Sequence, residues 1–390
     1  MNVWKPASSL LLSGAFALAL SMPAQAQKTI NLTAVSGYSP TASWVKIFKE
    51  YFIPEVDKRL AAGKEFKINW NEGFSGTIAK PREELAAVET GLADIGIVVT
   101  AFHVDRLPLY NVAFVTPFVA NDVGLVVKTI NQLTEKHPAM KQGWTKNNQI
   151  FLGASGSVDN YQVVCKPPIK DLADFKGKKI VGAGSNLLWL QGLGAVGVQG
   201  NLGEFGNNIQ TGIADCAMVW AEAAAGFKLY EVAPYYVKAD LGATNSFAVT
   251  VNIDAWKKLP PPVQKVLQEV AVGYGDALSK YVMEVSGKSL KTFASNNGKI
   301  VEFNQSQREQ WAKALPNIAQ DWAKAADKQG LPGTQILKEY MDVMRANNQP
   351  IARHWDKEYS PPDRRAQWNC LRMTKAVAPR RHCKPARSVI

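Results

Sequence analysis

Short strand-like segments alternate with helical segments from the N-terminal part of this chain onward. Three strand-like segments, KTINLTAV, EFKINW and LADIGIVV, occupy residues 28–35, 65–70 and 92–99. Between them, residues 44–63 and 76–91 place apolar side chains at helical spacing and end at a glycine. This βαβαβ order predicts a parallel sheet covered by helices, so the expected fold class is α/β.

The alternation returns further along the chain. We expect strands near 150–156, 161–166, 178–184, 214–220 and 246–252, and short helices near 186–194 and 204–212. From Pro260 to about Asn296, apolar residues recur every three or four positions, which predicts one long helix. Because such a helix exceeds what one small lobe needs, we expect it to run along two lobes. Two further helices are expected at 307–329 and 333–347.

The N-terminus has the pattern of an export signal. Lys5 precedes an apolar run from Leu10 to Leu20, and Ala24-Gln25-Ala26 matches the small-residue cleavage pattern. The apolar run is too short to cross a bilayer. We therefore expect a signal peptide at 1–26 and a soluble, periplasmic mature chain.

The net charge of +12 is concentrated at the C-terminus. Residues 361–390 hold eight Lys and Arg residues and one acidic residue, without periodicity. We expect a disordered basic tail there, with contact to anionic lipid as the alternative. The remaining sequence shows no basic stripe with interleaved aromatic residues, which argues against a nucleic-acid partner.

The cysteine and histidine residues show no metal-ligand spacing. The four histidines are scattered and no CxxC occurs, so neither a metal nor another cofactor is expected. Cys165 and Cys216 lie in apolar stretches. We favour two small buried thiols there over a disulfide, although export would permit one.

The stretch FKGKKIVGAGSNLLWLQGLGAVGV, residues 175–198, carries several glycines after a basic pair. It lacks the third glycine of a G-x-G-x-x-G fingerprint and reverses the order of a phosphate-binding loop. Nor does GASGS at 153–157 complete the G-x-S-x-G of a serine hydrolase, and no catalytic residues stand out. A strand that ends in glycines still lets a ligand approach the backbone at the carboxyl end of a sheet.

Several ordered motifs then resemble one family. The segments KPPIKDLADFKGKKIVGAGSNLLWLQGLGAVGV, FGNNIQTGIADCAMVW and VNIDAWKKLPPPVQKVLQEVA look like the core of one group of solute-binding proteins. These are the receptors of tripartite ATP-independent periplasmic (TRAP) transporters, of the dicarboxylate-binding type. EELAAVETGLADIGIV and RLPLYNVAFVTPF resemble the N-terminal lobe of that family, so the resemblance spans roughly residues 28–345.

The resemblance implies a periplasmic receptor with two lobes and a ligand cleft between them. Lobe I would comprise 27–150 and about 242–285, and lobe II would comprise 151–241 and about 286–360. The receptor would close over a small organic acid and deliver it to the membrane subunits of the transporter. A periplasmic sensing module is the alternative, and an exported enzyme is less favoured.

Val181 departs from the family pattern. After GKKI the family usually continues with an arginine that would pair with a substrate carboxylate through two hydrogen bonds, and valine cannot do so. Arg106 is a candidate replacement. The ligand is therefore expected to be either a carboxylate held by neutral donors or a neutral, aromatic or cationic molecule.

Candidate ligand-binding residues follow the expected strand ends, where they would face the crevice. They are Tyr38, Glu72, Phe74, Phe102, His103, Ser155, Asn160, Asn186, Trp189, Trp220, Glu222, Asn245 and Phe247. If Glu72 faces Tyr38, Phe74 and Trp220, a cation would suit the cleft. Core packing is the alternative for the aromatic residues, and a solvent-exposed position is the alternative for Glu72 and His103.

Overall fold

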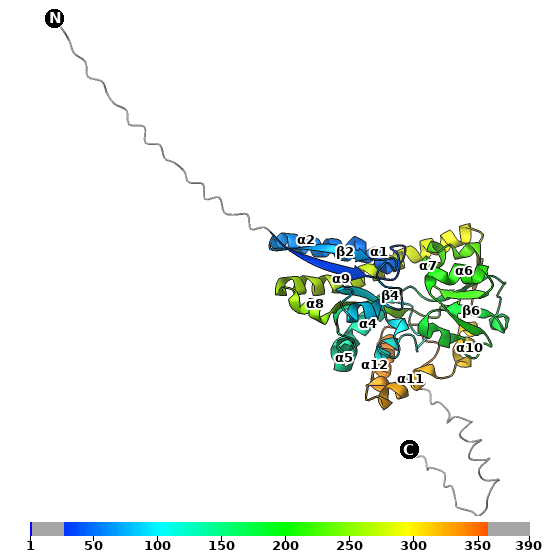
Figure 1. The fold of residues 1–390 in the computed structure, drawn as a ribbon. Coiled ribbons are helices and arrows are strands. Elements are labelled where there is room, and N and C mark those ends of the chain that lie inside the picture. The colour runs from blue at the N-terminus through cyan, green and yellow to red at the C-terminus, as the bar shows by residue number, and fades with distance from the viewer. Residues whose placement is uncertain (2–26, 358–390) are drawn as a thin grey trace, which may run out of the picture.

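The structure is a computed structural model that describes residues 27–357 together with Met1. Two bodies of sheet and helix lie side by side (Figure 1). The strands are β1 (Lys28–Val35), β2 (Phe66–Gly73), β3 (Ile95–Val99), β4 (Gln149–Val158), β5 (Gln162–Cys165), β6 (Lys179–Gly182), β7 (Val196–Gln199), β8 (Cys216–Val219), β9 (Tyr235–Lys238), β10 (Thr244–Asn252) and β11 (Lys299–Glu302). The helices are α1 (Ser43–Ile47), α2 (Ile53–Gly63), α3 (Glu84–Glu89), α4 (Val123–Lys136), α5 (Pro138–Thr145), α6 (Phe205–Gln210), α7 (Ala221–Gly226), α8 (Ile253–Lys258), α9 (Pro261–Ser295), α10 (Gln305–Ala314), α11 (Ile318–Lys328) and α12 (Gly333–Ala346). The expected signal peptide and the basic tail lie outside the described residues.

Lobe I is built on a five-stranded sheet in the order β2-β1-β3-β10-β4. Strand β1 pairs in parallel with β2 and β3, whereas β10 runs antiparallel to β3 and β4. Every residue of β3 and β10 is buried, as expected for central strands that are covered on both faces. The sheet is therefore mixed rather than wholly parallel, because β10 enters it from the second lobe.

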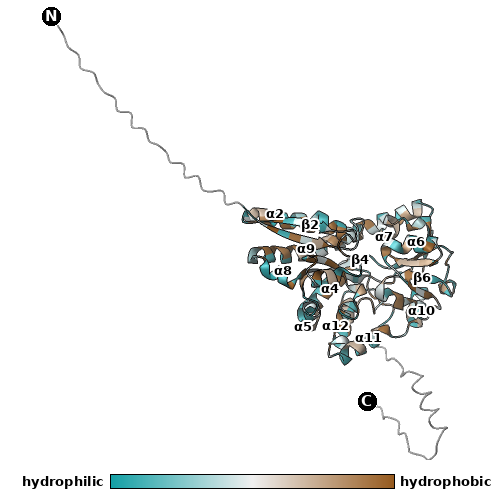
Figure 2. Ribbon diagram, viewed as in Figure 1, coloured by the Kyte–Doolittle hydropathy of each residue, from teal (hydrophilic) through white to brown (hydrophobic). Residues whose placement is uncertain are grey.

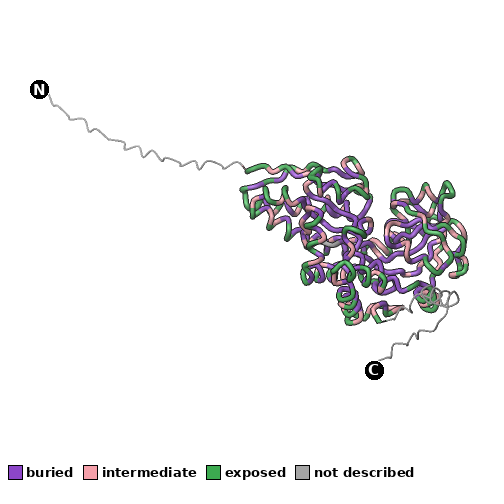
Figure 3. The backbone as a smooth tube through the Cα atoms, turned by 60° about the horizontal axis from the view of Figure 1, so that its bottom comes forward, coloured by how far each residue is buried: buried purple, intermediate pink, exposed green. Residues whose placement is uncertain are grey.

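Lobe II is built on a six-stranded sheet in the order β11-β9-β5-β8-β6-β7. The expected lobe boundary after residue 150 falls inside β4, which pairs with β10 in the first sheet. The chain therefore crosses to lobe II at 159–161 and returns at 239–243. These crossings lie together, since the Tyr161 amide donates to the Gly242 carbonyl at 3.1 Å and the Leu241 amide donates to the Tyr161 carbonyl at 3.0 Å. Buried backbone fills the interior of each lobe (Figure 3).

The expected long helix is confirmed as α9. Prolines at its first two positions suit the start of a helix, where no intrahelical donor is needed. Its buried residues include Val263, Leu267, Val270 and Tyr274, which follow steps of three and four. The helix packs against β4 of lobe I and against α7 of lobe II. It therefore spans both lobes, as the sequence predicts.

Two helices differ from the expectation because proline interrupts them. The expected helix at 307–329 is divided into α10 and α11, since Pro316 forces Leu315 into an extended conformation. Asn317 then caps α11 by accepting from the Gln320 amide at 3.1 Å. The expected helix at 76–91 is regular only over α3, after the turn that contains Pro81.

Hydropathy follows the two-lobed architecture. Hydrophobic residues line the sheets and the inward helix faces, whereas outward turns of helices such as α5 and α8 are hydrophilic (Figure 2). Within residues 27–357, no helix has the length and apolar character needed to cross a membrane. Among the same residues, no three potential metal-ligating His, Cys, Asp or Glu side chains gather together.

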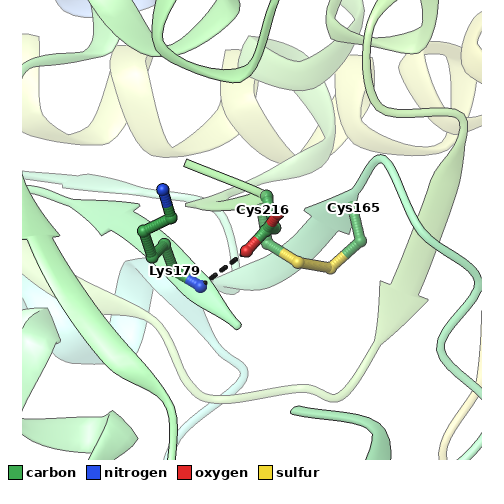
Figure 4. Close-up of a disulfide and its surroundings, with 4 residues drawn as sticks. Cys165, Lys179 and Cys216 are labelled. Carbon is green, nitrogen blue, oxygen red and sulfur yellow. Dashed lines mark hydrogen bonds between the residues drawn. A yellow bond between two sulfur atoms is a disulfide. The ribbon is translucent and has the colours of Figure 1, made fainter. Parts of the chain in front are cut away.

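A disulfide joins β5 to β8 inside lobe II, which corrects the favoured interpretation of two thiols. Cys165 and Cys216 stand opposite each other in the antiparallel register, with their Cα atoms 4.0 Å apart. In the neighbouring strand β6, the Lys179 amide donates to the Asp215 carboxylate at 2.8 Å, close to the bridge (Figure 4). The sequence could not show this pairing, because 51 positions separate the two cysteines.

We expect removal of this bridge by the double substitution Cys165→Ala and Cys216→Ala to lower the free energy of unfolding by about 2–4 kcal/mol. The loss arises because the unfolded chain regains the freedom of a long closed loop. Urea unfolding with and without dithiothreitol measures it. The reductant should weaken the native protein and leave the double variant unchanged. If dithiothreitol leaves the free energy of unfolding of the native protein unchanged, the two cysteines are free thiols instead.

Candidate functional site

A small cavity of about 40 Å³ lies between the lobes. It lies where the carboxyl ends of β1, β3, β6 and β8 converge, the usual ligand position in open α/β sheets. Its volume is a few times the space that one water molecule requires, so it suits a compact ligand. Lobe I, β10 and the crossing contribute Tyr38, Trp44, Val99, Ala101, Phe102, Val158, Tyr161, Ser246 and Phe247; lobe II contributes Ala183, Asn186, Leu202, Phe205, Met218 and Trp220.

Aromatic rings form most of the cavity wall. Trp44 stacks on Phe247 with ring centroids 5.0 Å apart and meets Tyr38 edge-on at the same distance. Across the cleft, Trp44 lies 6.2 Å from Trp220, which in turn contacts Tyr161 at 5.5 Å. This continuous aromatic wall favours a ligand with a flat or apolar body.

Two buried N–H donors on this wall make no hydrogen bond to the described residues. Trp44, from lobe I, is 3% exposed, and its indole Nε1 has no partner among them. Asn186, from lobe II, is fully buried and uses its Oδ1 to accept from the Ala183 amide at 3.0 Å, while its Nδ2 has no partner. Because a buried donor without an acceptor is costly, these two groups indicate an oxygen-bearing ligand.

Hydroxyl groups complete the polar part of the cavity. Burial raises the pKa of Tyr38 and of Tyr161 far above the usual tyrosine value, so both hydroxyls stay protonated. Hydrogen bonding with Ser246 opposes the effect of burial on the pKa of Tyr161. The cavity therefore offers several neutral donors from both lobes.

Among the described residues that line the cavity, there is no lysine, arginine or histidine. Val181 is fully buried in β6 and lies beside Gly200, close to the cavity-lining Phe205. Val181 is not among the described residues that line the cavity. Arg106 does not replace it, because its guanidinium pairs with Glu89 at 2.6 Å beside a separate hollow of about 330 Å³.

Three contacts hold the lobes together around the cavity. Gly184 has a φ of +64° and packs so closely on Ala101 of lobe I that a Cβ atom there would lie 2.2 Å from the Ala101 carbonyl oxygen. The Ser185 hydroxyl lies 2.8 Å from Asn111 Oδ1. At the rim, Gln199 Oε1 accepts from Arg82 at 2.7 Å and from the Gly184 amide at 3.1 Å when its amide is oriented to face both donors. The glycine stretch is thus a close-contact wall of the cleft.

Glu84 holds the strand ends on the lobe I side of the cavity through hydrogen bonds. It is fully buried and accepts from the Ser36 hydroxyl at 3.0 Å, the Gly37 amide at 2.7 Å and the Val99 amide at 3.0 Å. Burial raises its pKa to about 8, although the three donors oppose that shift. These bonds fix the ends of β1 and β3, which carry Tyr38 and Phe102 to the cavity.

Five of the candidate residues from the sequence meet at the cavity. They are Tyr38, Phe102, Asn186, Trp220 and Phe247. Arg82 stacks over the Phe102 ring with its guanidinium 4.3 Å from the ring centroid.

Three candidates lie on the lobe I side but away from the cavity. Glu72 pairs with Lys49 at 2.6 Å on the edge strand β2, and Phe74 packs against Phe48 in the core. The expected cation-binding cluster around Glu72 is therefore not formed. His103 is buried outside the cavity lining, and desolvation lowers its pKa to about 4, which keeps it neutral.

Two candidates lie on the paired strands β4 and β10. Ser155 on β4 stands opposite Ala248 in the sheet. Asn245 donates to the Tyr110 carbonyl at 2.8 Å. Asn245 is not among the described residues that line the cavity.

The remaining three candidates support the cavity or the crossing. Asn160 binds Asp240 at 3.1 Å within the crossing, and Trp189 donates to the Phe114 carbonyl at 2.6 Å. Glu222 accepts from the Trp220 indole at 3.0 Å, behind the cavity wall. Burial raises the pKa of Glu222 above its usual value.

Sequence reasoning missed Trp44, Tyr161 and Phe205. Trp44 shares the helical spacing of core residues, so its position in the sequence indicated packing alone. Tyr161 directly follows the candidate Asn160, and its place at a strand start was the available signal. Phe205 begins α6 away from any strand end.

Comparison with known proteins shows the same family and fold. The family of bacterial extracellular solute-binding proteins, family 7 (DctP), matches residues 46–329. A TRAP solute-binding protein from Rhodoferax ferrireducens, in complex with copurified benzoate, has a TM-score of 0.72 at 17% identity, with 81% of this chain and 98% of that chain covered.

Two structures of Bordetella proteins have comparable TM-scores to this chain. A TRAP periplasmic solute-binding protein from Bordetella bronchiseptica, with bound (R)- and (S)-mandelate, has a TM-score of 0.72 at 21% identity and covers 82% of this chain and 100% of that chain. DctP7 of Bordetella pertussis, an extracytoplasmic solute receptor that binds pyroglutamic acid, has a TM-score of 0.69 at 20% identity, with coverages of 80% and 99%. With its two-lobed fold and the match over residues 46–329, this chain belongs to the family 7 bacterial extracellular solute-binding proteins.

Proposed function

We propose that this protein is the periplasmic receptor of a TRAP transporter and binds a small organic acid between its lobes. The observation that carries the proposal is the pair of buried donors without partners, one from each lobe, on the wall of the cavity. A carboxylate that accepts from both would bridge the lobes. Because the bridge exists only when the lobes are closed, the ligand stabilises the closed state.

The family and the neighbouring structures support this ligand class. The neighbours named above carry benzoate, mandelate and pyroglutamic acid, which are all small organic acids. The same family membership supports delivery of the ligand to the membrane subunits of a TRAP transporter. The role as a receptor rather than an enzyme is supported by the family.

A thermal-shift screen of the mature protein tests the proposal. Its panel contains monocarboxylates, dicarboxylates, sugar acids, amines and neutral polyols. An acid at about 100 times its dissociation constant should add about 2.7 kcal/mol to the free energy of unfolding, which moves the melting temperature by several degrees. Recovery of the acid unchanged after incubation would support a receptor.

Two matched variants test whether the ligand-induced shift in melting temperature depends on the cavity. Trp220→Ala removes part of the cavity wall and should abolish the shift. Arg106→Ala, beside the separate hollow, should retain it. Stabilisation by amines or polyols alone would contradict the proposal, and so would an acid-induced shift that Arg106→Ala abolishes while Trp220→Ala does not.

A further inference from the structure

We infer that the ligand is a compact monocarboxylate with an apolar body, gripped by neutral N–H donors, and that dicarboxylates are rejected. The inference rests on the proposed function and narrows its ligand class. Three features of the cavity carry it: the donors without partners, the absence of a cation among the lining residues, and the buried acids behind the wall.

The donor set fits one carboxylate. Trp44 Nε1 and Asn186 Nδ2 are buried, line the cavity and make no hydrogen bond to the described residues. A carboxylate has two oxygens and several acceptor sites, so it can accept from both donors and from a hydroxyl of Tyr38 or Tyr161. Such charge-assisted hydrogen bonds stabilise an anion without a cationic partner.

The surroundings disfavour a second carboxylate. No lysine, arginine or histidine is present among the lining residues that the structure describes, so a second charge would be desolvated without a counter-ion there. Behind the wall, Glu222 accepts from the Trp220 indole at 3.0 Å. Glu84 lies close enough to Tyr38 to raise the pKa of its hydroxyl. Because burial raises the pKa of both acids, they repel further negative charge only at a pH above those raised values.

The rest of the cavity requires an apolar body. Phe205, Leu202 and Met218 face the cavity from lobe II, and the stacked rings of Trp44 and Phe247 face it from lobe I. The small cavity volume of about 40 Å³ favours a compact body. Hydroxyl-rich acids would leave their own polar groups without partners on this apolar surface.

Isothermal titration calorimetry of the mature protein with defined probes tests the inference. The probes are benzoate and isovalerate as monocarboxylates, succinate and malate as dicarboxylates, and benzamide as the neutral analogue of benzoate. We expect at least one monocarboxylate to bind at least about tenfold more tightly than either dicarboxylate, and benzoate to bind more tightly than benzamide, because charged acceptors form the stronger hydrogen bonds.

Two substitutions remove single donors while they retain the shape of the wall. Trp44→Phe keeps an aromatic ring and loses the N–H. Asn186→Asp keeps the oxygen that caps Ala183 and loses the amide donor. Each should weaken monocarboxylate binding by about tenfold to a hundredfold. Trp144→Phe is the matched control, because Trp144 is a buried indole of lobe I that does not line the cavity. It should leave the affinity unchanged.

The possible results separate the inference from the proposed function. Tight binding of succinate or malate would overturn the inference and leave the receptor for organic acids standing. Equal affinities of the native protein, Trp44→Phe and Asn186→Asp for a bound monocarboxylate would also overturn the inference alone. Benzamide binding as tightly as benzoate would overturn both, and so would a failure of every acid in both classes to bind.

Discussion

Gly184→Ala will weaken ligand binding by about a hundredfold or more while both lobes remain folded. An added Cβ atom would lie 2.2 Å from the Ala101 carbonyl oxygen across the cleft, so the lobes could not reach the closed arrangement. The positive φ of +64° adds a strain of about 1–2 kcal/mol for any residue with a side chain. Because apparent affinity falls with the population of the closed state, the loss appears directly in the dissociation constant.

A second glycine separates these two causes. Gly177 also lies in lobe II with a positive φ of +75°, but an added Cβ atom there meets nothing within 4 Å. Gly177→Ala therefore introduces a similar backbone strain but does not hinder closure of the lobes. Calorimetric titration with the acid that gives the largest thermal shift compares the two variants. Equal affinity in both would show that the contact with Ala101 does not govern closure.

Glu84→Gln will flatten the dependence of stability on pH between about pH 5 and pH 8. Burial raises the pKa of Glu84 to about 8 in the folded protein, above its ordinary value of 4.5. Between these values the folded state binds more protons than the unfolded state, so native stability falls as the pH rises. The contribution of Glu84 is complete below about pH 4.5 and is lost by about pH 8, a change of about 5 kcal/mol.

Glutamine removes this titration but not every hydrogen bond. Its oxygen can still accept from Ser36 and Gly37, whereas its amide group faces the Val99 amide, which is itself a donor. We therefore expect the variant to be less stable than the native protein at pH 5, with a difference that shrinks towards pH 8. Urea unfolding at four pH values measures this, with the exposed neighbour Glu83→Gln as the control. A constant difference would contradict the assignment.

The sequence predicts the helices and strands of this fold better than the breaks within them. Buried strands such as β3 and the long helix α9 are visible because their apolar patterns are long and regular. The break between α10 and α11 depends on one proline, Pro316, and its conformational effect on the preceding residue. The disulfide depends on the register of strands that lie far apart in the chain.

The sequence predicts site residues that lie at strand ends, but it does not predict the direction in which a side chain points. Tyr38 and Phe102 follow β1 and β3, adjacent strands whose carboxyl ends lead to the cavity. Glu72 follows the same rule, yet β2 is the edge strand of lobe I, so this side chain pairs with Lys49 instead. Trp44 lies on a helix, and a helical pattern cannot separate a core side chain from a cavity wall.

The order of strands in lobe I constrains how this protein can acquire its structure during synthesis. Strand β10 lies between β3 and β4 but follows them in the chain, after the whole of β5 to β9. As the chain emerges N-terminus first, the first sheet lacks a central strand until residue 252 is available. Until then the edges of β3 and β4 remain open to pairing with other chains, which is an aggregation hazard. Strands β5 to β9 of lobe II are continuous in the chain and can pair with one another before lobe I is complete, whereas β11 at the edge of that sheet follows β10.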